Sequence, residues 1–109
     1  MAQFDIYRNA GRQQQSIPFV VVVQSSLYDR YRRRVVVPLV RHSTLTGSDV
    51  LNASRLNPLF TVDGIEVVLH PLEIVSVGAD QLGDKVGSLA SEGNRITDAL
   101  DELLTQAWK

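Results

Sequence analysis

Residues 88–109 read SLASEGNRITDALDELLTQAWK and contain the clearest periodic pattern in the chain. Apolar side chains recur there every three or four residues, which places them on one stripe of an α-helix. Either Ser88 or Ser91 can cap the N-terminus of this helix. A helix with a single apolar stripe must pack on a sheet or on another copy of itself, so we expect it to dock against the rest of the fold. The stripe consists of Ile96, Leu100, Leu103, Leu104 and Ala107.

Trp108 is the only tryptophan of the chain and follows this stripe directly. At 100° per residue it falls about 80° from Leu100, on the edge of the stripe. A tryptophan in this place can pack into the core, or it can anchor an interface with a partner. The residue pattern leaves both interpretations open.

Strand patterns occupy most of the chain before the helix. Residues 3–8 alternate apolar and polar side chains, which is typical of a half-buried strand. Residues 17–23 form a β-branched run, which predicts a central strand buried on both faces, with Pro18 at its start. The polar turn between the two runs predicts a hairpin.

A third strand is expected at residues 35–37, where Pro38 must lie at a sheet edge or at a bulge because it has no N–H group. Asp63-Gly64 between the apolar runs 59–62 and 65–69 is the strongest hairpin signal, since it suits a type I′ turn. The remaining predictions are a basic connection at 27–34, a turn-rich segment at 44–55, a strand at 72–77 and a loop at 78–87.

The sum is about five to seven short strands and one C-terminal α-helix. This predicts a mainly β protein, built as a small barrel or a strongly bent antiparallel sheet with the helix against it. A length of 109 residues fits a single domain over residues 1–109, and 44% apolar residues suit a compact core.

Composition excludes several classes of protein. The formal net charge is −1, which argues against a general nucleic-acid coat and against a membrane-surface protein. The absence of cysteine excludes disulfides, thiolate metal sites and a cysteine nucleophile. No apolar run approaches the ~18 residues of a membrane span, and the N-terminus lacks the pattern of a signal peptide. We therefore expect a cytoplasmic protein.

The residues offer little for catalysis. His42 and His70 are the only histidines, and neither has a second ligand at metal-binding spacing, so a structural or solvent-facing role is expected for both. Nucleophile-elbow, phosphate-loop and dinucleotide-binding motifs are absent. No catalytic residue, cofactor or metal site is predicted.

The sharpest electrostatic feature is a run of arginines with interleaved tyrosines. It can bind phosphate and stack on bases, or form a solvated hairpin tip, or recognise an acidic peptide. The run comprises Tyr28, Arg30, Tyr31, Arg32, Arg33 and Arg34, with Asp29 beside them.

Six blocks together resemble the CcdB family of gyrase-poisoning toxins. The combination of a strand that ends in VQS, a strand RRVVVPL and a final apolar helix carries most of the resemblance, which covers nearly the whole chain. The blocks are QFDIY at 3–7, FVVVVQS at 19–25, RRVVVPL at 33–39, LNPLF at 56–60, LGDKV at 82–86 and the helix at 96–104.

The resemblance implies an SH3-like antiparallel barrel with a C-terminal helix, which forms a homodimer through sheet and helix. It implies the toxin half of a toxin–antitoxin pair, which binds the A subunit of DNA gyrase and traps the enzyme on cleaved DNA. A cognate antitoxin, with a disordered segment that folds on binding, would neutralise it. The protein would have no catalysis of its own, and neither membrane binding nor direct sequence-specific nucleic-acid binding is expected.

Site residues follow from the resemblance by position. Leu27 and Tyr28 occupy two apolar loop positions that family members use against the antitoxin, and Asp29, Arg33 and Arg34 complete the expected antitoxin site. Apolar anchors there would give burial, and arginines would give charge-assisted bonds.

The C-terminus departs from the family pattern. The best-known toxins end in Trp-Gly-Ile and bind gyrase there, whereas this chain has Thr105-Gln106-Ala107 at the aligned positions. Trp108 lies one residue further on, three residues after the aligned tryptophan position and on the same helical face. The expected gyrase-binding residues are Leu104, Ala107 and Trp108.

Two alternatives remain at this point. The same barrel type hosts endoribonuclease toxins, in which Arg33 and Arg34 would stabilise the phosphate transition state. A diverged, non-toxic homologue that keeps only the dimer is the other alternative.

Overall fold

A computed structural model describes residues 1–45 and 54–105 of the chain. Within this part the strands are β1 Asp5–Arg8, β2 Phe19–Val22, β3 Arg33–Arg41, β4 Leu59–Val62, β5 Ile65–Leu69, β6 Val75–Gly78 and β7 Lys85–Ser88, and the α-helix is α1 Gly93–Thr105. Short 3-10 turns lie at Ser26–Tyr28, His42–Thr44, Pro71–Glu73, Ala79–Gln81 and Ala90–Glu92.

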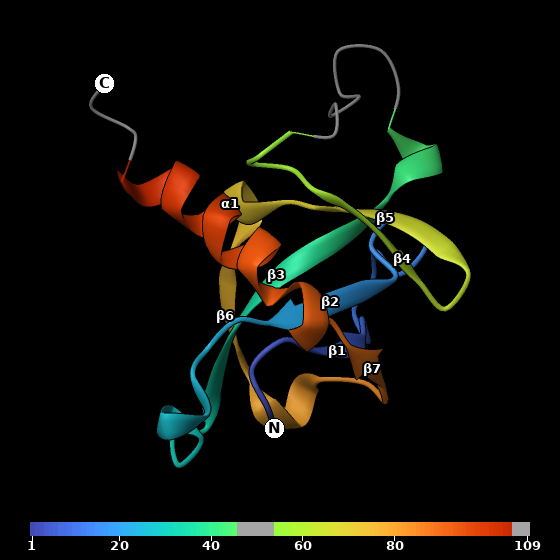
Figure 1. Cartoon of the computed structure of the whole chain (residues 1–109). Helices are drawn as coiled ribbons and strands as arrows, with labels where there is room; N and C mark the ends of the chain where they lie inside the picture. The colour runs from blue at the N-terminus through green and yellow to red at the C-terminus, as the bar shows by residue number, and fades with distance from the viewer. Residues whose placement is uncertain (46–53, 106–109) are drawn as a thin grey trace.

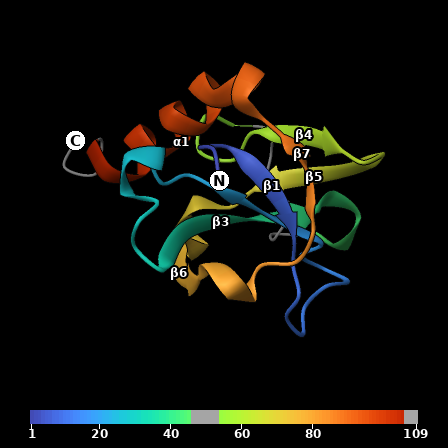
Figure 2. The ribbon, with the colours of Figure 1, turned by 90° about the horizontal axis from the view of Figure 1, so that it is seen from below.

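The strands form one strongly curled antiparallel sheet in the order β4-β5-β3-β2-β1-β7, and β6 pairs with β3 off this path (Figure 1). Helix α1 covers one face of the sheet, and the segment between β6 and β7 crosses below the opposite face (Figure 2). The predicted mainly β fold with a C-terminal helix, consistent with an SH3-like antiparallel barrel, is confirmed. In the described residues, no helix is long and apolar enough to cross a membrane.

Two apolar clusters hold the sheet together, one on each face. A smaller cluster on the face away from α1 contains Tyr7, Val22 and Val36, against which Val77 and Leu82 pack. The larger cluster joins the inner face to the helix and consists of Ile6, Phe19, Val21, Val37, Leu39, Phe60, Val62, Val67, Leu69, Leu89, Ile96 and Ala99.

Helix α1 begins later than the sequence predicts. Ser88 is the last residue of β7, paired with Asp5 of β1, and its hydroxyl oxygen accepts a bond of 3.0 Å from the N–H of Ala90. The chain then makes a 3-10 turn before the α-helix starts at Gly93. Both predicted caps are therefore wrong: long-range strand pairing takes Ser88 into the sheet, and Ser91 lies inside the 3-10 turn Ala90–Glu92.

The apolar stripe of α1 leaves the core towards its C-terminal end. Ile96 and Ala99 are fully buried, Leu100 packs partly against the core, and Leu104 is 70% exposed. Figure 1 shows this end of the helix extending past the edge of the sheet. The stripe therefore docks the helix with its first half and leaves an apolar side chain free in its last turn.

Pro38 lies inside β3 rather than at a sheet edge or a bulge. Its carbonyl accepts a bond of 3.1 Å from the N–H of His70, on the side that its own N–H would face. On this side β3 changes partner, from β6 at residues 33–36 to β5 at residues 39–41. The prediction of an edge or bulge was wrong. Its physical basis holds, because the missing N–H of Pro38 faces the point where β6 ends and β5 begins.

The hairpin at β4 and β5 is confirmed residue by residue. Asp63 and Gly64 have φ of 51° and 77°, the two positive values that a type I′ turn needs. Strand β7 was missed, since the segment 78–87 was predicted to be a loop. Its pairing with β1 shifts register between Ile6 and Tyr7, and such an irregular four-residue strand leaves no regular pattern in the sequence.

Candidate functional site

Residues 26–34, which comprise most of the connection between β2 and β3 and the first two residues of β3, form a compact surface loop that we call the arginine loop. Its first residues make a 3-10 turn, which starts because the hydroxyl oxygen of Ser25 accepts a bond of 3.3 Å from the N–H of Leu27. The carbonyls of Ser25 and Ser26 accept bonds from Tyr28 and Asp29. Local hydrogen bonds thus order the loop from its first residue.

Arg34 holds the loop from beneath. Its side chain points into the molecule and is only 7% exposed. The guanidinium donates to the carbonyls of Asp29 at 2.9 Å, Arg33 at 2.9 Å and Tyr31, and its Nε lies 3.7 Å from the carboxylate of Asp29. One buried cation therefore satisfies several carbonyls that the tight loop leaves without strand partners.

Gln24 fixes the loop from the side of β2. Its amide nitrogen donates to the carbonyl of Tyr28 at 3.2 Å, and its amide oxygen accepts from the N–H of Val35 at 2.9 Å. A single side chain thus ties the 3-10 turn to the start of β3. Together with Arg34, it leaves the loop preorganised, which reduces the conformational entropy lost when a partner binds.

The outer surface of the arginine loop is apolar, aromatic and basic. Leu27 is 82% exposed, and Tyr28 and Tyr31 are 53% and 55% exposed. The two tyrosine rings lie 6.4 Å apart, and the guanidinium of Arg30 lies 5.5 Å from the ring centre of Tyr31. Large exposed side chains of this kind are typical of protein-binding surfaces.

The five residues predicted to bind an antitoxin lie in three different surroundings. Leu27 and Tyr28 face solvent, whereas Asp29 and Arg34 contact each other within the loop. Arg33 reaches across to β6, where its Nε donates to the hydroxyl of Ser76 at 3.0 Å. The five residues therefore do not share one environment. Arg33 and Arg34 differ because neighbouring residues of a strand point to opposite faces.

Tyr31 belongs to the exposed surface but was not among the predicted site residues. The interleaving of tyrosine and arginine was visible in the sequence, and it was the available signal. The burial of Arg34 also had a signal. Starting β3 two residues earlier than predicted puts Arg34 on the same face as the buried Val36.

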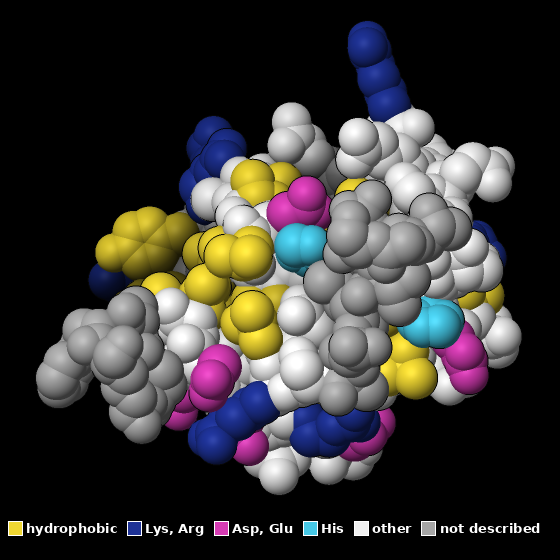
Figure 3. All heavy atoms as spheres, turned by 90° about the horizontal axis from the view of Figure 1, so that it is seen from above, with side chains coloured by type: hydrophobic (Ala, Val, Ile, Leu, Met, Phe, Trp, Pro, Cys, Tyr) yellow, Lys and Arg dark blue, Asp and Glu magenta, His cyan; other side chains and the backbone are white. Residues whose placement is uncertain are grey.

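One of the residues predicted to bind gyrase, Leu104, lies in the last turn of α1. Leu104 is largely exposed there, while Ala107 and Trp108 lie outside the described residues. The turn Pro71–Glu73 packs against α1 and exposes Leu72. Figure 3 shows hydrophobic side chains gathered on this side of the molecule.

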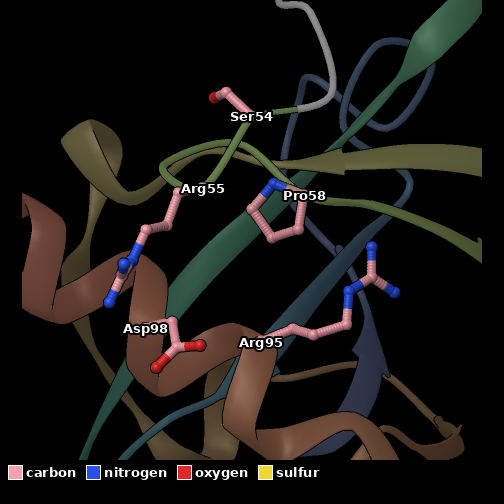
Figure 4. Close-up of a pocket in the computed structure, with 5 residues that line it drawn as sticks. All are labelled: Ser54, Arg55, Pro58, Arg95 and Asp98. Carbon is pink, nitrogen blue, oxygen red and sulfur yellow. The ribbon is translucent and has the colours of Figure 1, made fainter.

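A groove of about 190 Å³ lies between α1 and the segment before β4. Figure 4 shows Arg95 and Asp98 extending from the helix and Arg55 reaching towards it, with Pro58 between them. Arg95 donates to the carbonyl of Leu59 at 2.8 Å. The Arg95 guanidinium is also bonded to the carboxylate of Glu92. The Arg55 guanidinium lies 3.6 Å from the carboxylate of Glu102. Both arginines are paired with carboxylates, Arg95 with Glu92 just before the helix and Arg55 with Glu102 within it, so the groove is a docking contact of α1 rather than an anion site.

A second hollow of about 250 Å³ brings together Arg41, His42 and Glu66. Nδ1 of His42 lies 4.0 Å from the carboxylate of Glu66, a pair that their separation in sequence concealed. In the described residues, no group of three or more His, Cys, Asp or Glu side chains could hold a metal ion. The hollow therefore contains acid–base groups and a cation, but no assembled metal centre among the residues seen.

Comparisons with known proteins support a family assignment. Residues 3–106 match the family model described as CcdB protein. Comparison with curated protein sequences gave no match. Among solved structures, the fold is similar to that of an endoribonuclease in complex with its cognate antitoxin from a mycobacterial species. That similarity has a TM-score of 0.72 and 19% sequence identity over 100% of this chain and 99% of that chain, which shows a shared fold. Since the family match covers nearly the whole sequence, this chain belongs to the CcdB family.

Proposed function

We propose that this protein is the toxin of a toxin–antitoxin pair, that it binds the A subunit of DNA gyrase, and that it traps gyrase on cleaved DNA without catalysis of its own. Membership of the CcdB family supports this assignment. The single structural observation that carries it is the preorganised arginine loop, which exposes Leu27, Tyr28 and Tyr31.

Antitoxin binding fits the chemistry of the arginine loop. The exposed leucine and tyrosines offer apolar area, and Arg30 and Arg32 lie exposed beside them. A disordered segment with apolar and acidic residues would bury the former and form charge-assisted bonds with the latter. The loop contributes little ordering cost, since Arg34 and Gln24 already hold its shape.

Gyrase binding is proposed for the end of α1, with the exposed Leu104 and the sequence-predicted Ala107 and Trp108. Homodimer formation is proposed for the same side of the molecule. Leu72, on the turn that packs against α1, leaves apolar area there that a second copy would cover, which keeps Leu104 free for gyrase.

Expression of the protein in bacteria without an antitoxin tests the proposal. We expect growth arrest and covalent complexes between the gyrase A subunit and cleaved DNA. Deletion of Trp108 and Lys109 should abolish the arrest, and deletion of Lys109 alone is the matched control that should leave it. Growth arrest without gyrase–DNA complexes would contradict the gyrase mechanism.

The second candidate function is an endoribonuclease toxin. It is favoured by the shared fold with a known endoribonuclease and by the hollow that contains His42, Glu66 and Arg41. In this case His42 would transfer the proton and Arg41 would stabilise the phosphate charge, because Arg34 is committed to the loop. Incubation of the purified protein with RNA decides the matter. Cleavage that disappears in His42→Ala would establish this function, and intact RNA would exclude it.

A further inference from the structure

Strand β6 presents an edge of the sheet to solvent. It pairs with β3 through Val75 to Gly78, and within the described part of the chain no strand lies on its other side. An open edge is a template on which an extended segment of another chain can form main-chain hydrogen bonds. The side chains around this edge indicate what kind of segment would fit.

The pairing pattern shows which backbone groups face outward. Val35 directs its N–H to Gln24 and its carbonyl to the N–H of Val23, so both groups face β2. Its partner on β6 is Ser76, which must therefore direct its own N–H and carbonyl away from β3. The outward-facing backbone groups of the edge thus include those of Ser76, and by the same alternation those of Gly78.

Two side chains partly cover these outward groups. The Arg33 guanidinium donates to both the carbonyl and the hydroxyl of Ser76. The side-chain oxygen of Gln81 accepts a bond of 3.2 Å from the N–H of Gly78. Both caps are exposed side chains at the surface, and covering of this kind protects an edge from unspecific pairing. Either cap can leave when a better partner arrives.

The two faces of β6 differ in chemistry. Val75 and Val77 point to the face away from α1, beside a groove of about 180 Å³ that also contains Val36 and Pro38. Ser76 points to the other face, where the Arg33 guanidinium meets it. A strand added to this edge would therefore place alternate side chains against apolar area and against a cation.

We propose that the β6 edge binds, by strand addition, an extended segment of a partner protein in which apolar and acidic residues alternate. The apolar residues lie over Val75 and Val77, and an acidic residue takes the Arg33 guanidinium from the carbonyl of Ser76. The edge adjoins the arginine loop, because the side chain of Arg33 caps Ser76 and the N–H of Ala79 bonds to the carbonyl of Arg32 at 2.8 Å. The inference rests on the proposed antitoxin binding and adds where, and with what backbone geometry, such a segment binds.

The test uses the full chain and a peptide of about ten alternating Val and Glu residues, the upper end of the usual strand lengths. We expect the Glu peptide to bind at least about tenfold more tightly than a matched peptide with Lys in place of Glu. Binding should also slow hydrogen exchange of the Ser76 amide at least about tenfold, because strand addition bonds that group. Peptide binding without protection of the Ser76 amide would overturn the proposal.

Ser76→Pro removes the outward N–H and should weaken peptide binding about tenfold, the effect of roughly one hydrogen bond. Proline is tolerated on an edge strand whose N–H faces solvent, so the variant should fold. Ser76→Ala is the matched control and should keep the affinity, because it retains the N–H. Equal binding by both variants would contradict strand addition.

Three other outcomes test this inference, and the last two separate it from the proposed function. If the Ser76 amide becomes protected in the protein alone as its concentration rises, a second copy occupies the edge and the proposal is wrong. If the protein poisons gyrase and is neutralised by its antitoxin while Ser76 exchange stays unchanged, only the strand-addition proposal fails. If the peptide binds as expected but the protein is not toxic, strand addition stands and the proposed function fails.

Discussion

One buried arginine sets the shape of the surface that the proposed partner meets. Arg34 bonds three carbonyls of the arginine loop and lies beside the Asp29 carboxylate. Removing the Arg34 side chain would break these hydrogen bonds and leave carbonyl groups that have no other strand partner. Its charge therefore acts through the loop and not by direct contact with a partner.

We predict that Arg34→Ala lowers the free energy of unfolding by about 1–3 kcal/mol and increases hydrogen exchange in residues 28–31. Denaturant unfolding and amide exchange by NMR measure the two effects. Arg32→Ala is the matched control, since that side chain is exposed, and it should change stability by less than about 0.5 kcal/mol. Equal effects of the two substitutions would contradict the role given to Arg34.

Gly93 is a steric requirement at the start of α1. Glycine is a poor helix former, so helix propensity alone would favour alanine at this position. A Cβ atom on Gly93, however, would lie 2.5 Å from the ring of Phe4. We predict that Gly93→Ala destabilises the protein by about 1–3 kcal/mol, the range for overpacking, instead of stabilising it through helix propensity. Thermal or denaturant unfolding tests this.

Gly87→Ala serves as the control for Gly93, because a Cβ there meets nothing within 4 Å. It should change stability far less. If Gly93→Ala raises the melting temperature, the contact with Phe4 does not constrain the helix start and the account of Gly93 is wrong.

Tyr7 links stability to alkaline pH. Burial, and secondly the negative charge of Asp5, raise the pKa of Tyr7 above its ordinary value of 10.0. The folded state therefore holds the phenol proton more tightly than the unfolded state. Its stabilisation is complete below the unfolded pKa and is lost as pH rises through that value towards the folded pKa.

We predict that the urea midpoint of the native protein falls between about pH 9 and pH 11, and that Tyr7→Phe falls less over the same range. Tyr28→Phe is a control with an exposed ring and should follow the native curve. Identical curves for the native protein and Tyr7→Phe would contradict the link between Tyr7 and stability.

At the scale of elements, the β4–β5 hairpin shows what local chemistry can specify. Its Asp-Gly turn fixes the register, so both strands were predicted with their observed bounds. We predict that Gly64→Ala costs about 1–2 kcal/mol through its positive φ alone, since a Cβ there has no steric neighbour. Gly64→Asn should cost less, because asparagine tolerates this conformation, and chemical denaturation compares the two. Equal costs would show that the turn does not depend on positive φ.

Elements that depend on distant partners were predicted less well. Strand β7 and the late start of α1 both follow from the pairing of Ser88 with Asp5, which no nearby residue signals. Pro38 lies within a strand because β3 changes neighbours there, which is a property of the whole sheet. The apolar stripe of α1 was predicted, but its exit from the core at Leu104 depends on where the sheet ends.

The candidate site was predictable in position but not in detail. The family resemblance led to the arginine loop, and the aromatic residues within it were visible in the sequence. Which side chains face outward depends on the start of β3, which places Arg34 inside and leaves Tyr31 exposed. The predicted start of β3 at Val35 was two residues too late, so the division between the buried and the exposed arginines was missed.

At the scale of the whole molecule, the candidate binding surfaces lie outside the apolar core that joins sheet and helix. The arginine loop and the β6 edge adjoin through Arg33, and α1 packs beside the turn that leads into β6. This arrangement fits the proposal of one surface for an antitoxin and another for gyrase.

The central claim is that this protein traps gyrase on cleaved DNA. The most direct measurement incubates purified protein with DNA gyrase, supercoiled plasmid and ATP, then adds denaturant and protease and quantifies linear DNA. The account predicts that linear plasmid accumulates with the native protein and with the Lys109 deletion, but not after deletion of both Trp108 and Lys109. No linear plasmid above the gyrase-only level with the native protein would contradict it.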